Sequence, residues 1–596
     1  MCGIVGFIGK SNAQDFLING LKELEYRGYD SAGIAVVQDD TIKTYKAVGK
    51  IKNLEAKLDN NINSSIGIGH TRWATHGKPT ELNAHPHLGV YSYVVHNGII
   101  ENYKDLKDEL IQAGHTFVSQ TDTEVIVHLF EYYYNKLQNA SKAFEQTIAR
   151  LQGAYSILLL SQAAPNSIFF IKHGSPMAIA KNNNGDILFA SSDAPLIGLA
   201  SDVVYLEDGV SGVASNTTLT FSEDVSWTTL PVSKQTALKD GYRFFMEKEI
   251  YEQSNVVADC LLGRVNDEEI IFDELQNNDL SNIDEIKICA CGTSYHAGLT
   301  ASYLFERISK IRCSVEIASE FRYKEPLLNP NTLFIVISQS GETADTLEAL
   351  KMAKNAGLHT IVVCNVDNSS MTRLAHNTIL TRAGIEKGVA STKAFSTQTV
   401  VLWMLSLYFA KLRNQINSTN LKQQIKLLRE VPKSLIVKDS IHEKCRRLSK
   451  RYLHGHGFFF IGRDIFFPLA LEGALKLKEI SYLHAEGYPA GEMKHGPIAL
   501  ADPELFTIAL MPQNLHYDKV KSNVEELSAR DSTICAISPL PFELEDDYIR
   551  TSTQSHYMLE FFEMLVVVQL LSMEISIRLG NDVDMPRNLA KSVTVE

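Results

Sequence analysis

The second residue of the sequence, Cys2, carries a thiol at a position that can become the amino terminus. If the initiator Met1 is removed, as is common before a small residue, a thiol and a free α-amine stand on the same residue. The thiolate is the nucleophilic form of cysteine, and an α-amine with a pKa of about 8 can accept its proton directly or through a water. Cys2 is therefore a candidate nucleophile, although a cysteine at this position can also have no chemical role.

A second group of polar side chains follows the apolar run 332–337. Ser338, Ser340 and Thr343 supply hydroxyls, and Gly341 allows the backbone to come close to a ligand. A helix that begins after such a strand offers unsatisfied N–H groups and the positive end of its dipole to an anion. The pattern indicates an anion site, while simple capping of a helix by Ser and Thr stays an alternative for one such loop.

The segment Cys291-Gly292-Thr293-Ser294 follows the apolar run 286–290 in the same way. The carboxyl ends of parallel strands meet at one edge of a sheet, so two hydroxyl-bearing turns favour ligand binding over capping. The sequence has neither a G-x-G-x-x-G segment nor a Walker A loop here, so a sugar phosphate fits better than a nucleotide.

The run 470–480 places three ionisable side chains on one face of a predicted helix. Glu472, Lys476 and Glu479 follow the i, i+4 and i+3 spacing of neighbours on a helix surface. A carboxylate and an ammonium group side by side can move protons on a bound substrate. The same composition is also typical of a solvated helix face, and this alternative stays open.

The elements that must position these residues differ between the two parts of the chain. Up to about residue 215, short β-type runs alternate with turn residues and helical patterns, which predicts stacked sheets with helices outside. The runs include 33–37, 91–95 and 154–160, and the helical patterns lie near 12–25, 101–114 and 122–136.

From about residue 280, a strand, a polar loop and a helix follow one another repeatedly, in two copies. The first copy has strands at 286–290, 332–337 and 359–364, and the second has strands at 457–463 and 505–511 with a helix at 467–480. This order predicts two tandem α/β domains with parallel sheets. The polar stretch 222–240 is expected to be a linker that leads into a helix from Phe244.

Composition limits the class of protein. A chain of 596 residues is too long for one hydrophobic core, so three or four domains are expected. The formal net charge of −13, without a long Lys/Arg block, argues against nucleic-acid binding. The eight cysteines are too sparse for a disulfide scaffold and contain no C-x-x-C pair for zinc, which indicates a reducing compartment.

Two apolar runs could suggest a membrane protein. The run 399–410 is too short to span a bilayer, and the run 557–579 is interrupted by Glu560, Glu563 and Glu574. Both are predicted to be buried or interface helices. No signal-peptide pattern stands at the start, so we expect a cytoplasmic protein without membrane contacts.

The two hydroxyl-bearing loops resemble those of the sugar isomerase (SIS) domain, and five blocks near the start resemble the class II, Ntn-type glutamine amidotransferase domain. The blocks are 2–6, 26–33, 69–77, 96–102 and 119–124. Together they resemble the glutamine–fructose-6-phosphate aminotransferase (isomerizing) family over essentially the whole chain. The resemblance implies an α/β and α+β multidomain fold. An N-terminal Ntn-type four-layer αββα glutaminase domain would be followed by two tandem SIS domains, each an αβα arrangement around a parallel sheet.

The resemblance also implies domain boundaries. The glutamine amidotransferase domain would cover 2–217, and a linker with a connecting helix would cover 218–277. The two SIS domains would cover 278–420 and 449–586, and 587–596 would be a functional C-terminal tail. Asp464 departs from the family pattern, which has glycine at this turn of the second SIS domain.

For the N-terminal half, the resemblance implies that Cys2 attacks the glutamine amide. The side-chain amide of Asn97 and the backbone N–H of Gly98 would form the oxyanion hole. Arg72 would bind the substrate carboxylate and Asp122 its ammonium group. Trp73 would act as a gate between the two sites, and His76 would also contact substrate.

For the isomerase half, the resemblance implies that Glu479 is the proton-shuttling base with Lys476 as its partner. Lys591 would form a Schiff base with the open-chain ketose. His495 would be the ring-opening acid, contributed by the neighbouring subunit of a homodimer. The implied sugar-phosphate contacts are Thr293, Ser294, Ser338, Gln339, Ser340, Thr343, Val389, Ala390 and Ala590.

No cofactor and no metal are expected. Five histidines could suggest a metal site by their number, namely His70, His76, His85, His87 and His96. The family pattern accounts for several of them without a metal.

The resulting prediction is an enzyme that makes D-glucosamine 6-phosphate and L-glutamate from D-fructose 6-phosphate and L-glutamine, the first step of amino sugar synthesis. One alternative is a glutamine-dependent phosphoribosyl transferase, but the sequence lacks a phosphoribosyl-pyrophosphate loop with paired acidic residues. Another is a non-enzymatic sugar-phosphate sensor. The joint presence of Cys2, Glu479, His495 and Lys591 argues against the sensor.

Overall fold

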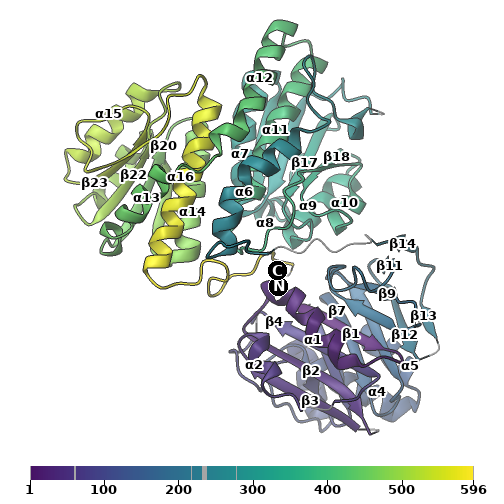
Figure 1. Ribbon diagram of the computed structural model, residues 1–596. Helices are drawn as coiled ribbons and strands as arrows, with labels where there is room; N and C mark the ends of the chain where they lie inside the picture. Colours follow the sequence, from purple (N-terminus) through teal and green to yellow (C-terminus); the bar gives the residue numbers. More distant parts are fainter. Residues whose placement is uncertain are drawn as a thin grey trace. The chain divides into compact units, whose positions relative to one another are not determined.

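The computed structural model describes residues 2–39, 41–59, 62–74, 76–216, 218–230, 238–276 and 278–594. The chain divides into two compact units, one comprising Met1–Thr236 with Ala590–Glu596 and the other Ala237–Leu589 (Figure 1). Each unit is described by itself. The expected removal of Met1 falls outside the described residues.

Unit 1 contains two antiparallel sheets. The first has the strand order β14-β11-β9-β10-β1-β4-β2-β3 and the second the order β13-β12-β8-β7-β6-β5. The strands of the first sheet are β1 (Gly3–Ile8), β2 (Ser31–Gln38), β3 (Thr41–Val48), β4 (Ile66–Arg72), β9 (Ala178–Lys181), β10 (Ile187–Ala190), β11 (Asp202–Tyr205) and β14 (Thr228–Thr229). Those of the second are β5 (His87–Leu88), β6 (Ser92–Ile100), β7 (Gly153–Ser161), β8 (Ser167–His173), β12 (Ser211–Ser215) and β13 (Leu219–Phe221).

Successive side chains along each strand point to opposite faces of the sheet, and this produces the layers of unit 1. In β1, Val5 and Phe7 pack on the helix side of the first sheet, whereas Ile4 and Ile8 face the second sheet. Helices α1 (Ala13–Leu24) and α2 (Ile51–Glu55), with the 3₁₀ turn η1 (Glu25–Arg27), accompany the first sheet, and α3 (Tyr103–Gln112), α4 (Glu124–Leu137) and α5 (Ala140–Ile148) cover the second. The predicted four-layer αββα arrangement is therefore confirmed.

Unit 2 contains two five-stranded parallel sheets, as predicted. The first has the order β16-β15-β17-β18-β19, formed by β15 (Glu285–Ala290), β16 (Arg312–Ile317), β17 (Thr332–Ser338), β18 (His359–Cys364) and β19 (Asn377–Leu380). The second has the order β21-β20-β22-β23-β24, formed by β20 (Gly457–Gly462), β21 (Ala485–Pro489), β22 (Leu505–Leu510), β23 (Thr533–Ser538) and β24 (Asp547–Arg550).

Both faces of each parallel sheet are covered, because every strand of a βαβ arrangement has helices above and below it. In β17, Phe334 and Val336 pack on one side while Ile335 and Ile337 pack on the other. The helices around the first parallel sheet are α7 (Gly292–Leu304), α8 (Ala318–Phe321), α9 (Ala344–Asn355), α10 (Ser370–Leu374) and α11 (Lys393–Leu412), with the π-helical turn η3 (Phe305–Ser309); the 3₁₀ turn η2 (Asp273–Leu275) precedes β15. Those that follow are α12 (Ser418–Ser434), α13 (Asp439–Leu448), α14 (Phe466–Ser481), α15 (Tyr517–Ser528) and α16 (Tyr557–Arg578), with η4 (Arg451–Leu453), η5 (Ala490–His495) and η6 (Pro497–Leu500).

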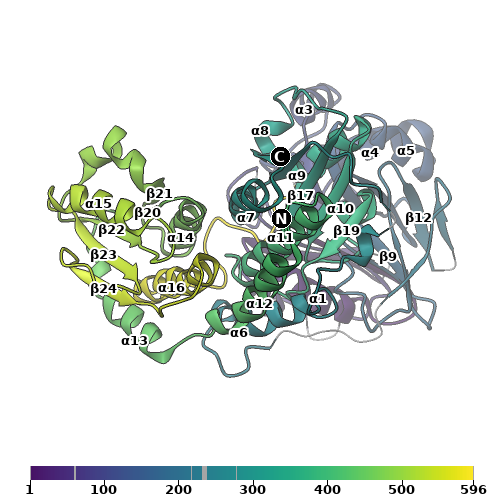
Figure 2. The ribbon, with the colours of Figure 1, turned by 90° about the horizontal axis from the view of Figure 1, so that it is seen from above.

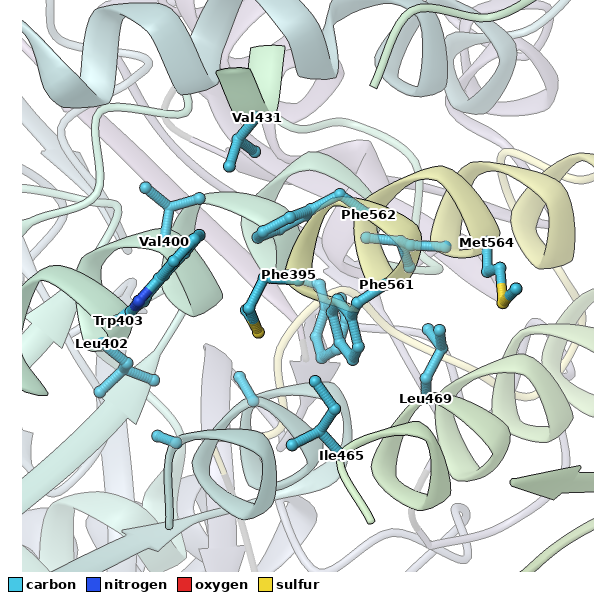
Figure 3. Packing of buried hydrophobic residues seen from close by; sticks show 14 of the residues in the cluster. Phe395, Val400, Leu402, Trp403, Val431, Ile465, Leu469, Phe561, Phe562 and Met564 are labelled. Atoms are coloured by element: carbon cyan, nitrogen blue, oxygen red, sulfur yellow. The ribbon is translucent and has the colours of Figure 1, made fainter. Parts of the chain in front are cut away.

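The two long apolar helices lie in the interior of unit 2, as the sequence predicts. All residues of α11 from Lys393 to Leu407 are buried, and α16 is buried from Met558 to Ser576. Figure 2 shows α16 beside α14, and Figure 3 shows the side chains that fill the space between α11, α14 and α16. No helix among the described residues has the length and apolar character needed to cross a membrane.

The acidic residues of α16 are tolerated in this interior because each has a partner. Glu560 accepts the backbone N–H groups of Gln513 and Asn514 at 2.8 and 3.0 Å. Glu563 pairs with Lys438 at 2.6 Å. The interrupted apolar pattern therefore marks a buried helix that ties neighbouring loops to itself.

The connecting helix α6 (Phe245–Leu261) packs against α11 and α12 (Figure 1). Its first N–H groups, those of Phe245 and Met246, donate to the carboxylate of Asp584 at 3.0 and 2.9 Å. The backbone carbonyl of Asp584 accepts the N–H of Val389 at 3.0 Å. A residue near the end of unit 2 thus caps its first long helix and holds the loop before α11.

The apolar core between the two parallel sheets of unit 2 predicts the effect of shortening one of its side chains. Phe561 on α16 is fully buried and lies 6.2 Å from the ring of Phe395 and 6.0 Å from that of Phe466 (Figure 3). Phe561→Ala should destabilise unit 2 by about 3–5 kcal/mol because it leaves a cavity in close-packed surroundings. Calorimetry should show a lower unfolding temperature. Tyr323→Ala, at a side chain that is 70% exposed, is the control, and equal unfolding temperatures for both variants would contradict this role.

Candidate active sites

Cys2 lies directly before β1, in the middle of the first sheet of unit 1. Gly3 pairs with Thr71 on β4, which brings Cys2 beside Trp73 at the end of that strand. The N–H of Trp73 donates to the Cys2 sulfur at 3.3 Å. Burial raises the pKa of the Cys2 thiol, and the hydrogen bond from Trp73 and the charge of Arg72 act against this rise.

Asn97 and Gly98 lie on β6, in the second sheet, and face the same end of the sandwich. The side-chain amide of Asn97 donates to the backbone carbonyl of Cys2 at 3.2 Å. Gly98 has a φ of +130°, and a Cβ there would lie 1.9 Å from the carbonyl oxygen of Ala154. The structure therefore brings Cys2, Trp73 and Asn97 together, at a point where residue 98 must be glycine.

Arg72 and Asp122 are both buried and both border the loop after β4. Arg72 donates to the carbonyl oxygens of His76 and, at 3.1 Å, of Gly77. Asp122 accepts the N–H of Ile100 at 2.8 Å, and its other oxygen lies 3.9 Å from Nδ1 of His76. A ligand carboxylate that binds Arg72 must share or replace the loop carbonyls that now accept from it.

Asp30 is a residue of this site to which the sequence assigned no role. Its carboxylate accepts the N–H of Ala74 at 2.8 Å, and its own N–H donates to the carbonyl of Arg72 at 2.9 Å. These bonds fix the chain on both sides of Trp73. Asp30 belongs to the block 26–33 that carried the family resemblance, but its partner lies more than 40 residues further along the chain.

Four of the five histidines form a buried row between the two sheets. The rings of His70 and His85 lie 3.9 Å apart, and those of His85 and His87 lie 4.6 Å apart. The hydroxyl of Thr123 bonds both His85 and His96 at 3.0 Å. Burial lowers the pKa of His70 to about 3 and that of His85 and His87 well below its ordinary value.

One group of side chains in the described part of the chain has the proximity that metal binding needs, and it is not this row. Glu247, His442 and Glu574 offer ligand atoms within 4.8 Å of one another. Arg243 lies 2.6 Å from both glutamates, and His442 lies 2.8 Å from Glu574. Because a guanidinium already pairs with the carboxylates, the group forms an ion-pair network that links α6, α13 and α16.

In unit 2, the loop 338–343 joins β17 to α9 and is folded around its own hydroxyls. Gly341 N–H donates to Ser338 Oγ at 2.9 Å, and Glu342 N–H donates to Ser340 Oγ at 3.2 Å. Gly341 has a φ of +68°, and a Cβ there would lie 1.9 Å from Ser369 Oγ. Gln339 lies within this loop, and Thr343 stands at the N-cap of α9, where its side chain makes no capping bond.

Thr293 and Ser294 lie in the first turn of α7 rather than in a separate turn before it. Since β15 and β17 are neighbours and parallel, α7 begins at the same edge of the sheet as the loop 338–343. Ser294 Oγ accepts from Gln398 on α11 at 3.1 Å. Val389 and Ala390 lie buried just before α11.

The ionisable face of α14 is buried against α7, which excludes the alternative of a solvated helix face. Glu472 and Lys476 are both 0% exposed. Lys476 Nζ lies 2.7 Å from Glu479 and 3.4 Å from Glu472, and donates to Thr293 Oγ1 at 3.1 Å. Burial alone would lower the pKa of Lys476, but the two carboxylates raise it above its ordinary value.

His296 on α7 completes this group and was not expected from the sequence. Its Nδ1 lies 2.8 Å from the second oxygen of Glu472, while Thr293 donates to the first at 3.1 Å. The site therefore joins an element of each SIS domain. The sequence does place a histidine one helical turn after Thr293. The residues around it in the sequence, however, do not indicate that its side chain faces α14.

The remaining predicted residues are His495, Ala590 and Lys591. His495 is exposed at the end of η5, directly before Gly496 with a φ of +148°. Ala590 and Lys591 belong to unit 1 in the division of the chain, so their predicted place beside the α14 residues stays a prediction.

Comparison with known proteins defines the class to which these two sites belong. The glutamine amidotransferase domain family matches residues 83–197, and the SIS domain family matches residues 279–408 and 456–543. A solved structure of the C-terminal domain of glucosamine-fructose-6-phosphate aminotransferase from Francisella tularensis is 39% identical with a TM-score of 0.57, covering 59% of this chain and all of that one. The chain is therefore a glutamine amidotransferase domain followed by two SIS domains.

Full-length relatives make the assignment specific. The glutamine–fructose-6-phosphate aminotransferase [isomerizing] of Campylobacter jejuni is 61% identical, and that of Helicobacter pylori is 52% identical, in both cases over 100% of each chain. The chain belongs to the glutamine–fructose-6-phosphate aminotransferase (isomerizing) family.

The buried histidines predict a pH dependence of stability. Below pH 6.5 the unfolded chain binds protons on these residues, whereas the folded chain keeps them neutral. The free energy of unfolding of unit 1 should therefore be at its full value above pH 6.5 and decrease as the pH falls below 6.5. The slope is at most about 1.4 kcal/mol per pH unit for each histidine. Calorimetry between pH 7.5 and 5.0 should show a falling unfolding temperature for unit 1.

Two variants control this experiment. His87→Gln removes one buried proton site and should flatten the slope, whereas His484→Gln changes a histidine whose side chain is 69% exposed and should leave it unchanged. An unfolding temperature of unit 1 that stays constant across this range would contradict the prediction.

Proposed function

We propose that the chain converts L-glutamine and D-fructose 6-phosphate to L-glutamate and D-glucosamine 6-phosphate. The observation that carries this proposal is the presence, in one chain, of the Cys2–Asn97 pair and of the buried Glu472 and Lys476 beside Thr293, with the partly exposed Glu479 paired to Lys476. The full-length relatives bear the name of an enzyme with the same two substrates.

The first half-reaction is hydrolysis of the glutamine amide. The Cys2 thiolate attacks the amide carbon, and the negative charge on the oxygen is stabilised by the Asn97 amide and the Gly98 N–H. Collapse releases ammonia and leaves a thioester, which water hydrolyses to glutamate. Arg72 and Asp122 hold the carboxylate and ammonium of the substrate, His76 contributes to the same pocket, and Trp73 closes it toward the second site.

The second half-reaction consumes that ammonia, which is transferred within the protein. His495 protonates the ring oxygen of fructose 6-phosphate, and Lys591 forms a Schiff base with the open ketose and is displaced by ammonia. Glu479 then moves a proton from C1 to C2, which yields the aldose amine, while Lys476 stabilises its carboxylate. Ammonia enters and one water leaves, so the atoms balance.

The hydroxyls of one sheet edge support the phosphate-binding part of the proposal. Ser338, Ser340 and Thr343 would bind the phosphate together with the first N–H groups of α9. Gln339, Thr293, Ser294, Val389, Ala390 and Ala590 would contact the sugar around them.

A homodimer follows from the same proposal. His495 is exposed in the single chain, and an acid of the reaction needs a closed surrounding to direct its proton. We assign His495 to the site of the partner chain, so that each active site contains residues of two chains.

Cys2→Ala tests whether the two half-reactions are separable. The variant should lose glutamine-dependent formation of hexosamine phosphate to background, because no other thiol replaces the nucleophile, and should retain synthesis with added ammonia. The wild-type chain with glutamine and fructose 6-phosphate is the control. Release of glutamate by the wild type without any hexosamine phosphate would rule out the proposed function, and equal loss of both activities in the variant would rule out separate sites.

Complementation tests the shared site. Glu479→Gln and His495→Ala should each be inactive, but their co-expression should restore about a quarter of the activity, because half of the dimers are mixed and each mixed dimer has one intact site. Co-expression of Glu479→Gln with Lys476→Ala is the matched control and should restore nothing, since both defects lie in one chain's helix α14. If the first pair also restores nothing, His495 does not cross the interface.

A further inference from the structure

His70 stands between the two sheets at the Cys2 site without touching Cys2. It lies on β4, two residues before Arg72, and is fully buried. Its Nε2 lies 3.1 Å from Oδ1 of Asn97 and 3.0 Å from the backbone carbonyl of His96 on β6. One ring nitrogen thus bridges from the first sheet to the strand that carries Asn97.

The chemistry of the partners determines where the imidazole hydrogen is. Both atoms that Nε2 faces are carbonyl oxygens, which only accept, so Nε2 carries the hydrogen and Nδ1 does not. In agreement, Nδ1 of His70 is buried without a hydrogen-bond partner among the described residues. The tautomer follows from geometry alone.

The same bond determines the orientation of Asn97. If the Asn97 amide were flipped, its NH₂ group would face the N–H of His70 and two donors would meet in a buried place, where an unpaired polar group costs about 1–3 kcal/mol. With the observed orientation, the NH₂ group points to the Cys2 side and reaches the Cys2 carbonyl at 3.2 Å.

We propose that His70 is a positioning residue for the glutaminase reaction, which holds the Asn97 amide with its N–H groups directed at the oxygen that becomes negatively charged. The inference rests on the proposed function, because it assigns His70 to the oxyanion donor of that reaction. His70 acts through Asn97 and contacts neither substrate nor the reacting atoms.

The surroundings of His70 suit this role. Burial, with Arg72 and His96 nearby, keeps the pKa of the ring at about 3, so the hydrogen on Nε2 does not depend on pH in the range where the enzyme works. The ring centroid of His70 lies 3.9 Å from that of His85, with the ring planes tilted by 33°, and His85 is held by Thr123. A donor held this way needs no reorganisation when charge develops on the substrate.

The test compares two substitutions in the full chain. His70→Leu removes the donor, whereas His70→Gln keeps an amide N–H at nearly the reach of Nε2. Loss of one oxyanion donor costs about 10²–10³ in kcat, so kcat with glutamine should fall by about 10–100-fold in His70→Leu, where Asn97 is misdirected but present. KM for glutamine should change less than about threefold, since Arg72 and Asp122 bind the ground state.

Two further measurements distinguish a positioning role of His70 from a role in folding. His70→Gln should recover most of kcat, and ammonia-dependent synthesis should be unchanged in both variants. His87→Leu is the matched control, because His87 is a buried member of the same row that bonds Thr121 and not Asn97. It should lower the unfolding temperature of unit 1 without the loss of kcat.

A double-mutant cycle tests whether His70 acts through Asn97, even if His70→Leu is poorly folded. In an Asn97→Ala background, His70→Leu should cost less than about twofold more in kcat per folded enzyme, because residues that act through each other are not additive. Additive losses would overturn the proposal, as would wild-type kcat in His70→Leu or equal losses in His70→Leu and His70→Gln. Each of these outcomes leaves the wild-type reaction intact and so differs from a failure of the proposed function.

Discussion

The interior ion pairs of Lys476 are the interaction on which unit 2 depends. An unpaired ammonium moved into a protein interior costs several kcal/mol, so a fully buried lysine needs anionic partners and hydrogen bonds. Glu472 and Glu479 supply the charge from its own helix, and Thr293 supplies an oxygen from α7. Because those partners come from both SIS domains, neither sheet alone can hold this lysine. The apolar core around Phe561, shown in Figure 3, packs α14 together with α11 and α16, and α11 in turn packs against α7.

In unit 1, the polar groups buried between the two sheets beside Cys2 include neutral histidine side chains. Its inner histidines remain uncharged, because burial disfavours the imidazolium form, and Thr121 and Thr123 satisfy ring nitrogens. Neutral imidazoles cost far less to bury than charged ones and can donate in fixed directions. The donors that face Cys2 are therefore in place before any substrate arrives. Near Cys2, the ionisable side chains of Arg72 and Asp122 lie on the border of the loop after β4.

The two sets of candidate site residues lie in different units of the chain. In the proposed function, Cys2 and Asn97 act on the glutamine amide and do not select the sugar, whereas the hydroxyls after β15 and β17 bind the phosphate and include no nucleophile for an amide. Both sets lie at the ends of strands, where a rigid sheet holds side chains that the loops leave accessible. The thiol of Cys2 and the ammonium group of Lys476 need different electrostatic surroundings, and the fold places them in the interiors of different units.

Much of this organisation was readable from the sequence. Hydrophobic periodicity located the strands of both parallel sheets and the buried helices α11 and α16, because burial on two faces leaves an uninterrupted apolar run. The motifs around Cys2, Arg72, Asn97 and Ser338 indicated the two chemistries, since each needs particular side chains at short spacing. Only the tertiary structure decided whether the face of α14 is solvated or buried. It alone placed Asp30, His70 and His296 in hydrogen bonds at the candidate sites, because their partners lie on other elements far along the chain. Side-chain spacing reports neighbours on one element, whereas burial and cross-strand hydrogen bonds depend on how the elements pack.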